Sequence, residues 1–348
     1  MHIRTVRNME KIRDIPSSEL VKEIKAGWGL GNTLEAAGAR DLSSETSWGN
    51  PFTTVEMITA VKNAGFNIVR IPVTWCNHMD ENGSVDEKWL CRVREVVDYA
   101  YEQGMFVILN IHHENWHDPY YENEESAVRT LVNLWTQIGN HFEQYGERLI
   151  FEALNEPRKR RTSLEWNGGD EEGHQVVNHL NSAFVSTIRG LGGNNPLRHL
   201  MIPTYAASSA EPALKGFVFP EGDDKLIVSI HAYLPYEFAL GDDPEENRFT
   251  AAEDKDVARF MSLLKKYFTD KGIPVIIGEF GARNKNNITD RTEWAEYYVS
   301  KAKELGIPCI LFDNGHSEGR GETFGLLDRK TCDWSFPEIV QAVVKASG

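Results

Sequence analysis

Short apolar runs alternate with longer amphipathic stretches along most of the chain. Each run has the length and the apolar or β-branched content of a buried strand. The stretches between the runs carry apolar residues at helical spacing, and this alternation is typical of a parallel sheet whose strands are connected by helices. The pattern predicts eight strands, at Ile24–Leu30, Asn67–Val73, Phe106–Ile111, Leu149–Leu154, His199–Pro203, Leu226–His231, Pro274–Phe280 and Pro308–Asp313.

Helices are expected between these strands, and several of them are followed by a glycine. Glycine readily adopts the left-handed conformation that ends a helix, and it occurs in this position at Gly65, Gly104, Gly146, Gly272 and Gly306. The unit between the fifth and sixth strands is short and gives the weakest helix pattern. The expected helices are Thr53–Ala64, Asp86–Gln103, Ser126–Tyr145, Glu172–Leu191, Glu253–Lys271 and Thr292–Leu305.

Eight consecutive strand–helix units favour a closed barrel over an open sheet. The chain has 348 residues, which is the size of a (β/α)₈ barrel with loop insertions. Its composition, with 41% hydrophobic and 26% charged residues, is that of a folded globular protein. We therefore expect a single-domain α/β protein, a (β/α)₈ TIM barrel over residues 24–348, with an N-terminal extension at 1–23 that packs on the barrel or precedes it.

The charge of the chain argues against several classes of partner. A net charge of −15 repels nucleic acids and anionic membrane surfaces, so a neutral ligand fits better. No apolar run approaches the length of a membrane span, and Met1–Glu23 lacks the apolar centre of a signal peptide. We expect a secreted protein whose leader is missing from this sequence, with a cytoplasmic protein as the alternative.

The four cysteines do not suggest a metal site. They have no C-x-x-C pair and no metal-ligand spacing, so structural thiols are expected, and a disulfide between distant cysteines stays open. They are Cys76, Cys91, Cys309 and Cys332.

Polar residues collect where the predicted strands end. In a (β/α)₈ barrel the active site lies at the carboxyl ends of the strands, so these residues would meet on one rim. Any single one could be a solvated strand end, but six strands contribute to the set. They are Arg70 on the second strand, His112, His113 and Glu114 after the third, Asn155 and Glu156 after the fourth, His231 and Tyr233 after the sixth, Glu279 on the seventh, and Asp313 and Asn314 after the eighth.

Glu156 and Glu279 suit glycoside hydrolysis. Such a reaction needs one carboxyl to protonate the leaving oxygen and a second, ionised one to attack the anomeric carbon, and a retaining enzyme holds the two about 5–5.5 Å apart. Arg70 could keep the pKa of Glu279 low, while the charge of Glu279 would raise the pKa of Glu156. Asn155 suits a bond to a sugar 2-hydroxyl.

Tryptophans near strand ends are candidate stacking surfaces for sugar rings, with core packing as the alternative for each. They are Trp28, Trp48, Trp75 and Trp116.

Several motifs together make the chain similar to glycoside hydrolase family 5, and in particular to its subfamily 4 of endoglucanases, lichenases and xyloglucanases. The similarity runs in order from Gly27 to Glu338. The motifs are Gly27–Glu35, Thr46–Pro51, Val69–Trp75, Leu154-Asn155-Glu156-Pro157 and Gly278-Glu279-Phe280-Gly281.

The resemblance implies a (β/α)₈ barrel, no cofactor, no metal and double displacement with retention of configuration. It assigns Glu156 as acid/base and Glu279 as nucleophile. Two positions depart from the family pattern. Gly29 stands where asparagine is frequent, and Phe312 stands where the family usually carries tryptophan, so the sugar platform there loses an indole N–H and some area. The substrate-binding residues expected from the motifs and strand ends are Arg70, His112, His113, Asn155, His231, Tyr233, Asn32, Trp48, Trp116 and Phe312.

Three other chemistries deserve comparison with this interpretation. His113-Glu114-Asn115-Trp116-His117 matches the zinc motif H-E-x-x-H, but the motif requires a helix and here it follows a strand. Gly27-x-Gly29-x-Gly31 is close to a dinucleotide-binding loop but lacks its last glycine. A metal-dependent barrel enzyme would use Glu156, Glu279 and Asp313 as ligands.

The sequence therefore predicts a retaining endo-β-1,4-glucanase, without cofactor, that cleaves cellulose-type glucans, mixed-linkage β-glucan and xyloglucan. The alternatives are an endo-β-1,4-mannanase or xylanase on the same scaffold, or a non-catalytic carbohydrate-binding barrel. The expected partner is a β-glucan polysaccharide or oligosaccharide, and we expect a monomer.

Overall fold

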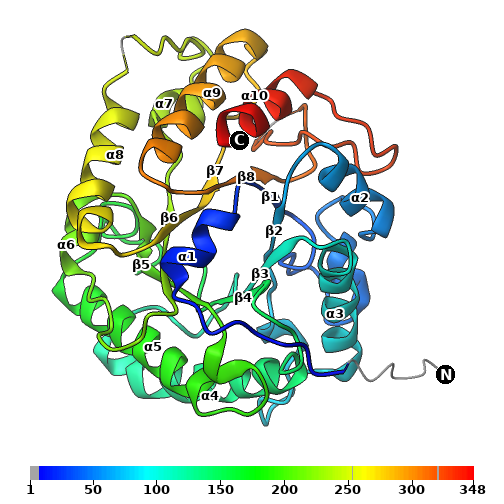
Figure 1. Cartoon of the computed structure of the whole chain (residues 1–348), viewed down its shortest axis with the longest axis vertical. Helices are drawn as coiled ribbons and strands as arrows, with labels where there is room; N and C mark the ends of the chain where they lie inside the picture. Colours follow the sequence, from blue (N-terminus) through cyan, green and yellow to red (C-terminus); the bar gives the residue numbers. More distant parts are fainter. Residues whose placement is uncertain (1–7, 253, 320) are drawn as a thin grey trace.

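Eight parallel strands close into a barrel in chain order (Figure 1). The computed structural model describes residues 8–252, 254–319 and 321–348. The predicted α/β class and the (β/α)₈ architecture are confirmed. The strands are β1 (Ala26–Leu30), β2 (Ile68–Ile71), β3 (Phe106–Asn110), β4 (Leu149–Glu152), β5 (Leu200–Ser208), β6 (Leu226–His231), β7 (Val275–Phe280) and β8 (Cys309–Asp313).

Helices surround the barrel and cover the outer face of the strands. Acidic N-caps begin two of them: the Asp86 side chain accepts from the Lys88 N–H at α3, and the Asp170 side chain accepts from the Gly173 N–H at α5. The helices are α1 (Ser17–Leu20), α2 (Val55–Asn63), α3 (Glu87–Tyr101), α4 (Tyr121–His141), α5 (Glu171–Arg189), α6 (Glu211–Gly216), α7 (Tyr236–Ala239), α8 (Asp256–Tyr267), α9 (Ile288–Glu304) and α10 (Pro337–Ser347).

Some element ends differ from the prediction. The α4 helix begins at Tyr121 instead of Ser126, because its first turn is polar and carries no apolar period. The expected helix at Glu253–Lys271 starts at Asp256, and Glu253 itself lies outside the described residues. The β5 strand continues to Ser208, beyond the expected Pro203. The α10 helix, which was not predicted, packs its apolar face against α9.

Four of the five expected helix-ending glycines have the left-handed backbone. Their φ angles are 107° at Gly65, 82° at Gly104, 73° at Gly272 and 69° at Gly306. The prediction was wrong for Gly146, which has no positive φ and follows α4 at a distance. Its N–H instead donates to the Tyr101 hydroxyl at 2.9 Å, so this glycine belongs to a loop contact.

The N-terminal segment closes one end of the barrel. Leu20, Val21 and Ile24 are buried in a cluster with inward-facing residues from the amino-terminal halves of the strands, among them Ile68 and Ile276. The α1 helix therefore crosses the barrel opening in Figure 1. Leu20 and Val21 belong to the expected extension at 1–23, of which residues 1–7 lie outside the described residues. Since this end is filled, the opposite end is free for chemistry.

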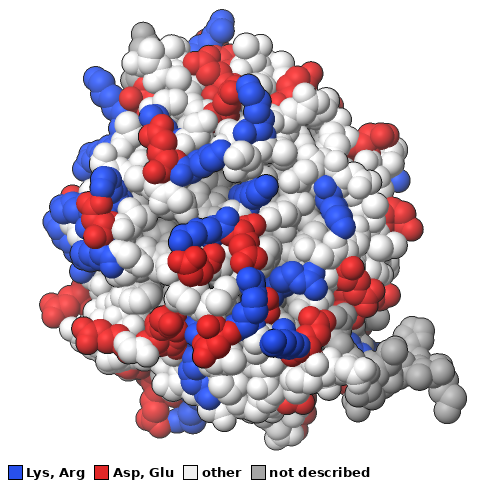
Figure 2. All heavy atoms as spheres, viewed as in Figure 1, with Lys and Arg blue, Asp and Glu red and all other residues white. Residues whose placement is uncertain are grey.

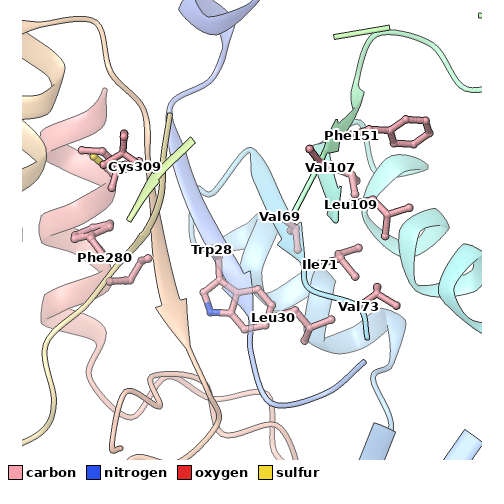
Figure 3. Close-up of a cluster of buried hydrophobic side chains, with 14 of the residues drawn as sticks. Trp28, Leu30, Val69, Ile71, Val73, Val107, Leu109, Phe151, Phe280 and Cys309 are labelled. Atoms are coloured by element: carbon pink, nitrogen blue, oxygen red, sulfur yellow. The ribbon is translucent and has the colours of Figure 1, made fainter. Parts of the chain in front are cut away.

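Two of the tryptophans considered as sugar platforms belong to the core. Trp28 and Trp75 are fully buried. Their indole N–H groups donate to the Asp313 carboxylate and to the Asn110 carbonyl, each at 3.0 Å. Figure 3 shows Trp28 among aliphatic side chains of the first strands. Core packing, the alternative reading, is correct for both.

The surface and the thiols agree with the composition. Figure 2 shows acidic and basic side chains intermixed on the face that α1 crosses, so this face has no single-sign field. All four cysteines are free thiols, and burial raises the pKa of Cys76 to about 12. No helix among the described residues has the length and apolar content needed to span a membrane.

A buried histidine predicts acid sensitivity of the fold. His78 stacks on Trp89 with ring centroids 3.6 Å apart, and burial lowers the pKa of His78 to about 4 from 6.5. Below pH 6.5 the unfolded chain binds a proton that the folded chain does not, so the free energy of unfolding falls as the pH is lowered toward 4. We expect this histidine to lower the free energy of unfolding by about 1 to 2 kcal/mol between pH 7 and pH 5.

The His78→Phe variant keeps a stacked ring and removes the titrating group. Urea unfolding of both proteins at pH 7 and pH 5 should show a smaller loss of stability for the variant. Equal losses would mean that His78 does not contribute to the acid sensitivity.

Candidate active site

A cleft of about 910 Å³ opens at the carboxyl ends of the strands. Most of the residues predicted from the sequence to form the site line it. Two do not, because Arg70 lies beneath the cleft floor and Trp116 lies outside the lining. The predicted residues in the lining are Asn32, Trp48, His112, His113, Asn155, Glu156, His231, Tyr233, Glu279 and Phe312.

The two predicted catalytic carboxyls face each other across this cleft. Glu156 follows β4, and Glu279 lies on β7. A carboxyl oxygen of each lies within 4.8 Å of the other and of a His231 ring nitrogen. This close approach agrees better with the carboxyl spacing of about 5–5.5 Å in retaining glycosidases than with the wider spacing of inverting enzymes.

Glu279 is held by two donors. The Arg70 guanidinium Nη1 lies 2.6 Å from its Oε1, and the Tyr233 hydroxyl donates to its Oε2 at 2.7 Å. Burial, followed by the charge of Glu279, raises the pKa of Tyr233 well above its usual value, so the hydroxyl stays protonated. Each oxygen of Glu279 thus accepts a hydrogen bond from a donor of the barrel.

Arg70 is anchored below the cleft by a residue that the sequence analysis missed. Its Nε donates to the buried Glu152 carboxylate at 2.7 Å, which also accepts from Ser229 Oγ at 2.6 Å and from Asn110 Nδ2 at 3.0 Å. A charged residue inside the apolar run of β4 is the signal that could have identified Glu152.

Asn155 and His112 complete this network. The Asn155 Oδ1 accepts from Arg70 Nη2 at 2.8 Å, which leaves its amide N–H groups for a ligand. His112 Nδ1 lies 3.1 Å from the amide nitrogen of Asn110. Burial, with the charges of His113 and Arg70, lowers the pKa of His112 well below its usual value, so the ring is neutral.

Glu156 has a charge environment opposite to the expected one. Its Oε1 lies 2.8 Å from His231 Nδ1, and its Oε2 lies 3.4 Å from Arg158 Nη1. Burial raises the pKa of Glu156, but the hydrogen bond and charge of His231, with the charges of Arg158 and His113, outweigh it and lower the pKa below its usual value. The expectation of a raised pKa was therefore wrong, because it considered the charge of Glu279 and left out His231 and Arg158.

Aromatic rings line the other side of the cleft. Phe312 packs against Tyr233 and Phe324, with ring centroids 6.4 and 5.7 Å away. A Cβ atom on Gly31 would lie 2.6 Å from the Phe312 ring, so the close approach requires glycine there. Trp48 is 38% exposed and tilts toward His113.

The remaining predicted residues have mixed positions. Asn32 has a φ of 57°, and its carbonyl accepts from Asn50 Nδ2 at 2.9 Å. Trp116 donates its indole N–H to Glu114 at 2.6 Å and is not among the residues that line the cleft. Further residues that sequence reasoning missed also line the cleft, and no periodic signal marks them. They include Glu35, Arg158, Trp166, Glu322 and Phe324 in loops and Ser208 at the end of β5.

The zinc motif, the dinucleotide loop and a metal site formed with Asp313 do not fit the structure. Residues 112–120 contain no helix, and Glu114 accepts from the backbone N–H groups of Trp75 and Cys76. Asp313 accepts from Trp28 and from the backbone of Leu327, away from Glu156 and Glu279. Gly27 and Gly29 lie within β1 and not in a loop. In the described part of the chain, the side chains close enough to share an ion are Glu156, His231 and Glu279.

Comparison with known proteins gives consistent matches over nearly the whole chain. The profile of "Cellulase (glycosyl hydrolase family 5)" matches residues 34–318. Endoglucanase B from Neocallimastix patriciarum is 48% identical over 347 residues, covering 97% of this chain and 73% of that protein. Endoglucanase A from Ruminococcus albus is 45% identical over 342 residues, covering 96% and 94%.

A solved structure superimposes closely on this barrel. It is a GH5-4 broad specificity endoglucanase from Ruminococcus champanellensis with bound cellotriose. The two share 44% identity and a TM-score of 0.92, over 96% of this chain and 100% of the other.

Proposed function

The chain belongs to glycosyl hydrolase family 5, and on that premise we propose that it is a retaining endo-β-1,4-glucanase of subfamily 4. The observation that carries this proposal is the pair of carboxyl groups, Glu156 and Glu279, whose nearest oxygens lie within 4.8 Å on opposite sides of the cleft. A retaining glycosidase needs this spacing, because one group must attack the anomeric carbon while the other protonates the leaving oxygen.

In the first step a Glu279 oxygen attacks the anomeric carbon. The glycosidic C–O bond breaks, and the proton of Glu156 passes to the departing oxygen. The products are a glycosyl ester of Glu279 and a shortened glucan with a free hydroxyl. Arg70 and Tyr233 hold Glu279 by its two oxygens and so fix the direction of attack.

In the second step water replaces the departed glucan. The Glu156 carboxylate takes a proton from this water while the water oxygen attacks the anomeric carbon. The bond between that carbon and Glu279 breaks, and the Glu279 carboxylate is released. His231 Nδ1 lies 2.8 Å from Glu156 Oε1 and helps to orient the carboxyl group. Two inversions give net retention, and no cofactor is needed in either step.

The substrate that we propose is a β-1,4-linked glucan. The related structure holds cellotriose, a neutral oligosaccharide, and the cleft here combines aromatic rings with neutral hydrogen-bonding groups. Cellulose-type glucans, mixed-linkage β-glucan and xyloglucan are the proposed substrates. Because such polymers are too large to enter a cell, we also propose that the enzyme acts outside it. We further propose that it acts as a monomer.

A substrate panel with product stereochemistry tests the proposal. Carboxymethyl-cellulose, mixed-linkage β-glucan, xyloglucan, mannan and xylan would be assayed for reducing-sugar release and for the anomer first formed, by proton NMR. We expect internal cleavage of the glucans and initial release of the β-anomer. Initial α-anomer would exclude double displacement, faster cleavage of mannan or xylan would exclude the proposed specificity, and affinity without product would indicate a non-catalytic barrel.

A further inference from the structure

Arg158, two residues after the acid/base, is packed against it from the β4–α5 loop. Its Nη1 donates to the Glu156 carbonyl at 2.9 Å and lies 3.4 Å from Glu156 Oε2. The side chains are 18% and 15% exposed, so the pair is shielded from bulk water. A charge interaction at this depth is stronger than the same contact on the surface.

The guanidinium is held in place from its other sides. It lies 4.1 Å from the ring centroid of Trp166, and its Nε donates to Glu165 at 3.2 Å. Glu165 also accepts from the Arg161 N–H at 2.7 Å. Arg158 therefore has little freedom to leave Glu156, and the ordering that the contact requires is already present in the folded protein.

The loop itself is tied to the barrel. The Tyr205 hydroxyl accepts from the Lys159 N–H at 2.8 Å and donates to the Leu164 carbonyl at 3.1 Å. The Lys159 ammonium bridges Asp170 and Glu172 at 2.8 and 2.5 Å. These contacts hold the segment that follows Arg158 and carries Trp166, and Trp166 in turn packs on the guanidinium.

We propose that Arg158 is a positioning residue for the acid/base, which orients the Glu156 carboxyl and stabilises the carboxylate that remains after its proton has moved to the leaving group. This inference rests on the proposed function, since it assigns Arg158 a part in the same reaction. Arg158 does not touch the reacting atoms and acts through Glu156.

Several charged groups surround Glu156, and Arg158 differs from all of them. His231 on β6 and His113 after β3 lose their positive charge on deprotonation, whereas the guanidinium keeps its charge throughout the working range. Glu279 on β7 and Glu322 in the loop after β8 oppose ionisation of Glu156, and the Tyr233 hydroxyl is neutral. Arg158 thus supplies the part of the favourable field that does not depend on pH.

The expected effect of removing this charge has a defined sign. Without Arg158 the carboxylate form of Glu156 is less stable, so its pKa rises and the protonated acid persists to higher pH. The alkaline limb of kcat/KM, which follows loss of the acid, then moves upward. Proton transfer is also less well aligned, so kcat falls while binding of the sugar chain is largely kept.

The test compares Arg158→Met and Arg158→Lys with the wild type on two substrates. Phenyl β-cellobioside needs an acid to release its phenol. The leaving group of 2,4-dinitrophenyl β-cellobioside departs without one. For Arg158→Met we expect the alkaline limb on the phenyl substrate to move up by about one pH unit and kcat to fall about 10- to 100-fold. The rate of ester formation from the dinitrophenyl substrate should change less than about threefold. Arg158→Lys keeps the charge, so its shift of the alkaline limb and its fall in kcat should both be smaller than those of Arg158→Met.

Arg160→Met is the matched control. Arg160 belongs to the same loop and pairs with Asp118 and the Glu114 carbonyl instead of Glu156. An unchanged alkaline limb in Arg158→Met, or an equal shift in Arg160→Met, would overturn the proposal. A merely structural loss would lower the thermal unfolding temperature and reduce the turnover of both substrates equally. This result would also overturn the proposal. Failure of the proposed function would look different. The wild-type protein would then turn over the cellobiosides without cleaving β-glucan.

Discussion

Replacing Glu279 with glutamine is expected to reduce turnover of mixed-linkage β-glucan on the order of 10⁴-fold or more, because an amide cannot form the glycosyl ester. The structure favours an intact fold in this variant. A glutamine carbonyl can still accept from Arg70, and the Tyr233 hydroxyl can turn to accept from the amide. The loss should therefore appear in kcat and not in thermal stability.

The nucleophile can be identified directly by trapping. A 2-deoxy-2-fluoro aryl β-cellobioside should leave its fluorinated cellobiosyl group on Glu279 of the wild type, with release of the phenol, and mass spectrometry of the peptide would locate it. Glu279→Gln should stay unlabelled. Glu304→Gln, at the exposed end of α9, is a matched control that should be labelled normally. Label on another residue, or near wild-type turnover in Glu279→Gln, would refute the assignment.

Replacing Glu156 with glutamine should have the second largest effect, and it should depend on the leaving group. We expect turnover of β-glucan to fall about 10²- to 10⁴-fold, the usual contribution of a general acid or base. With 2,4-dinitrophenyl β-cellobioside the ester on Glu279 should still form, since this leaving group departs without a proton. Hydrolysis of the ester then becomes slow because no base activates water, and a burst of the phenol should precede the slow steady state.

Azide distinguishes loss of the base from general damage. It is a nucleophile that needs no proton removal, so it should accelerate the steady state of Glu156→Gln and yield β-cellobiosyl azide. The wild type, in which Glu156 is ionised after the first step, should respond little. Absence of both the burst and the azide effect would assign the acid/base role to another group.

Much of the barrel could be predicted because each of its units is encoded locally. A run of apolar residues, an amphipathic stretch and a glycine give the strand, the helix and its end within about forty residues of chain, as at Asp86–Gln103 with Gly104 and β3. The misplaced ends occur where polar first turns hide the helical period, as at Tyr121, or where an irregular strand extends beyond its apolar run, as at β5.

The sequence predicted which residues meet at the cleft better than it predicted their environment. Glu156 and Glu279 could be selected because carboxyls directly behind buried strands must lie on the same rim of a parallel barrel. Arg158 and Trp166 could not, since a loop residue carries no period that says where its side chain turns. The same limit explains why Trp28 and Trp48 looked alike in sequence, although one is buried in the core and the other lines the cleft.

The sequence by itself determined the architecture, and it selected the two carboxyls that we propose as reacting groups, because short-range pattern and strand order place both on one rim of the barrel. Only the tertiary structure decided how those groups are supported and which charges surround Glu156. The direction of the pKa shift of Glu156 depends on His231 and Arg158 lying within about 3.5 Å of its oxygens. An electrostatic interaction depends on separation in space and on burial, and for side chains on different strands neither is written in their spacing along the chain.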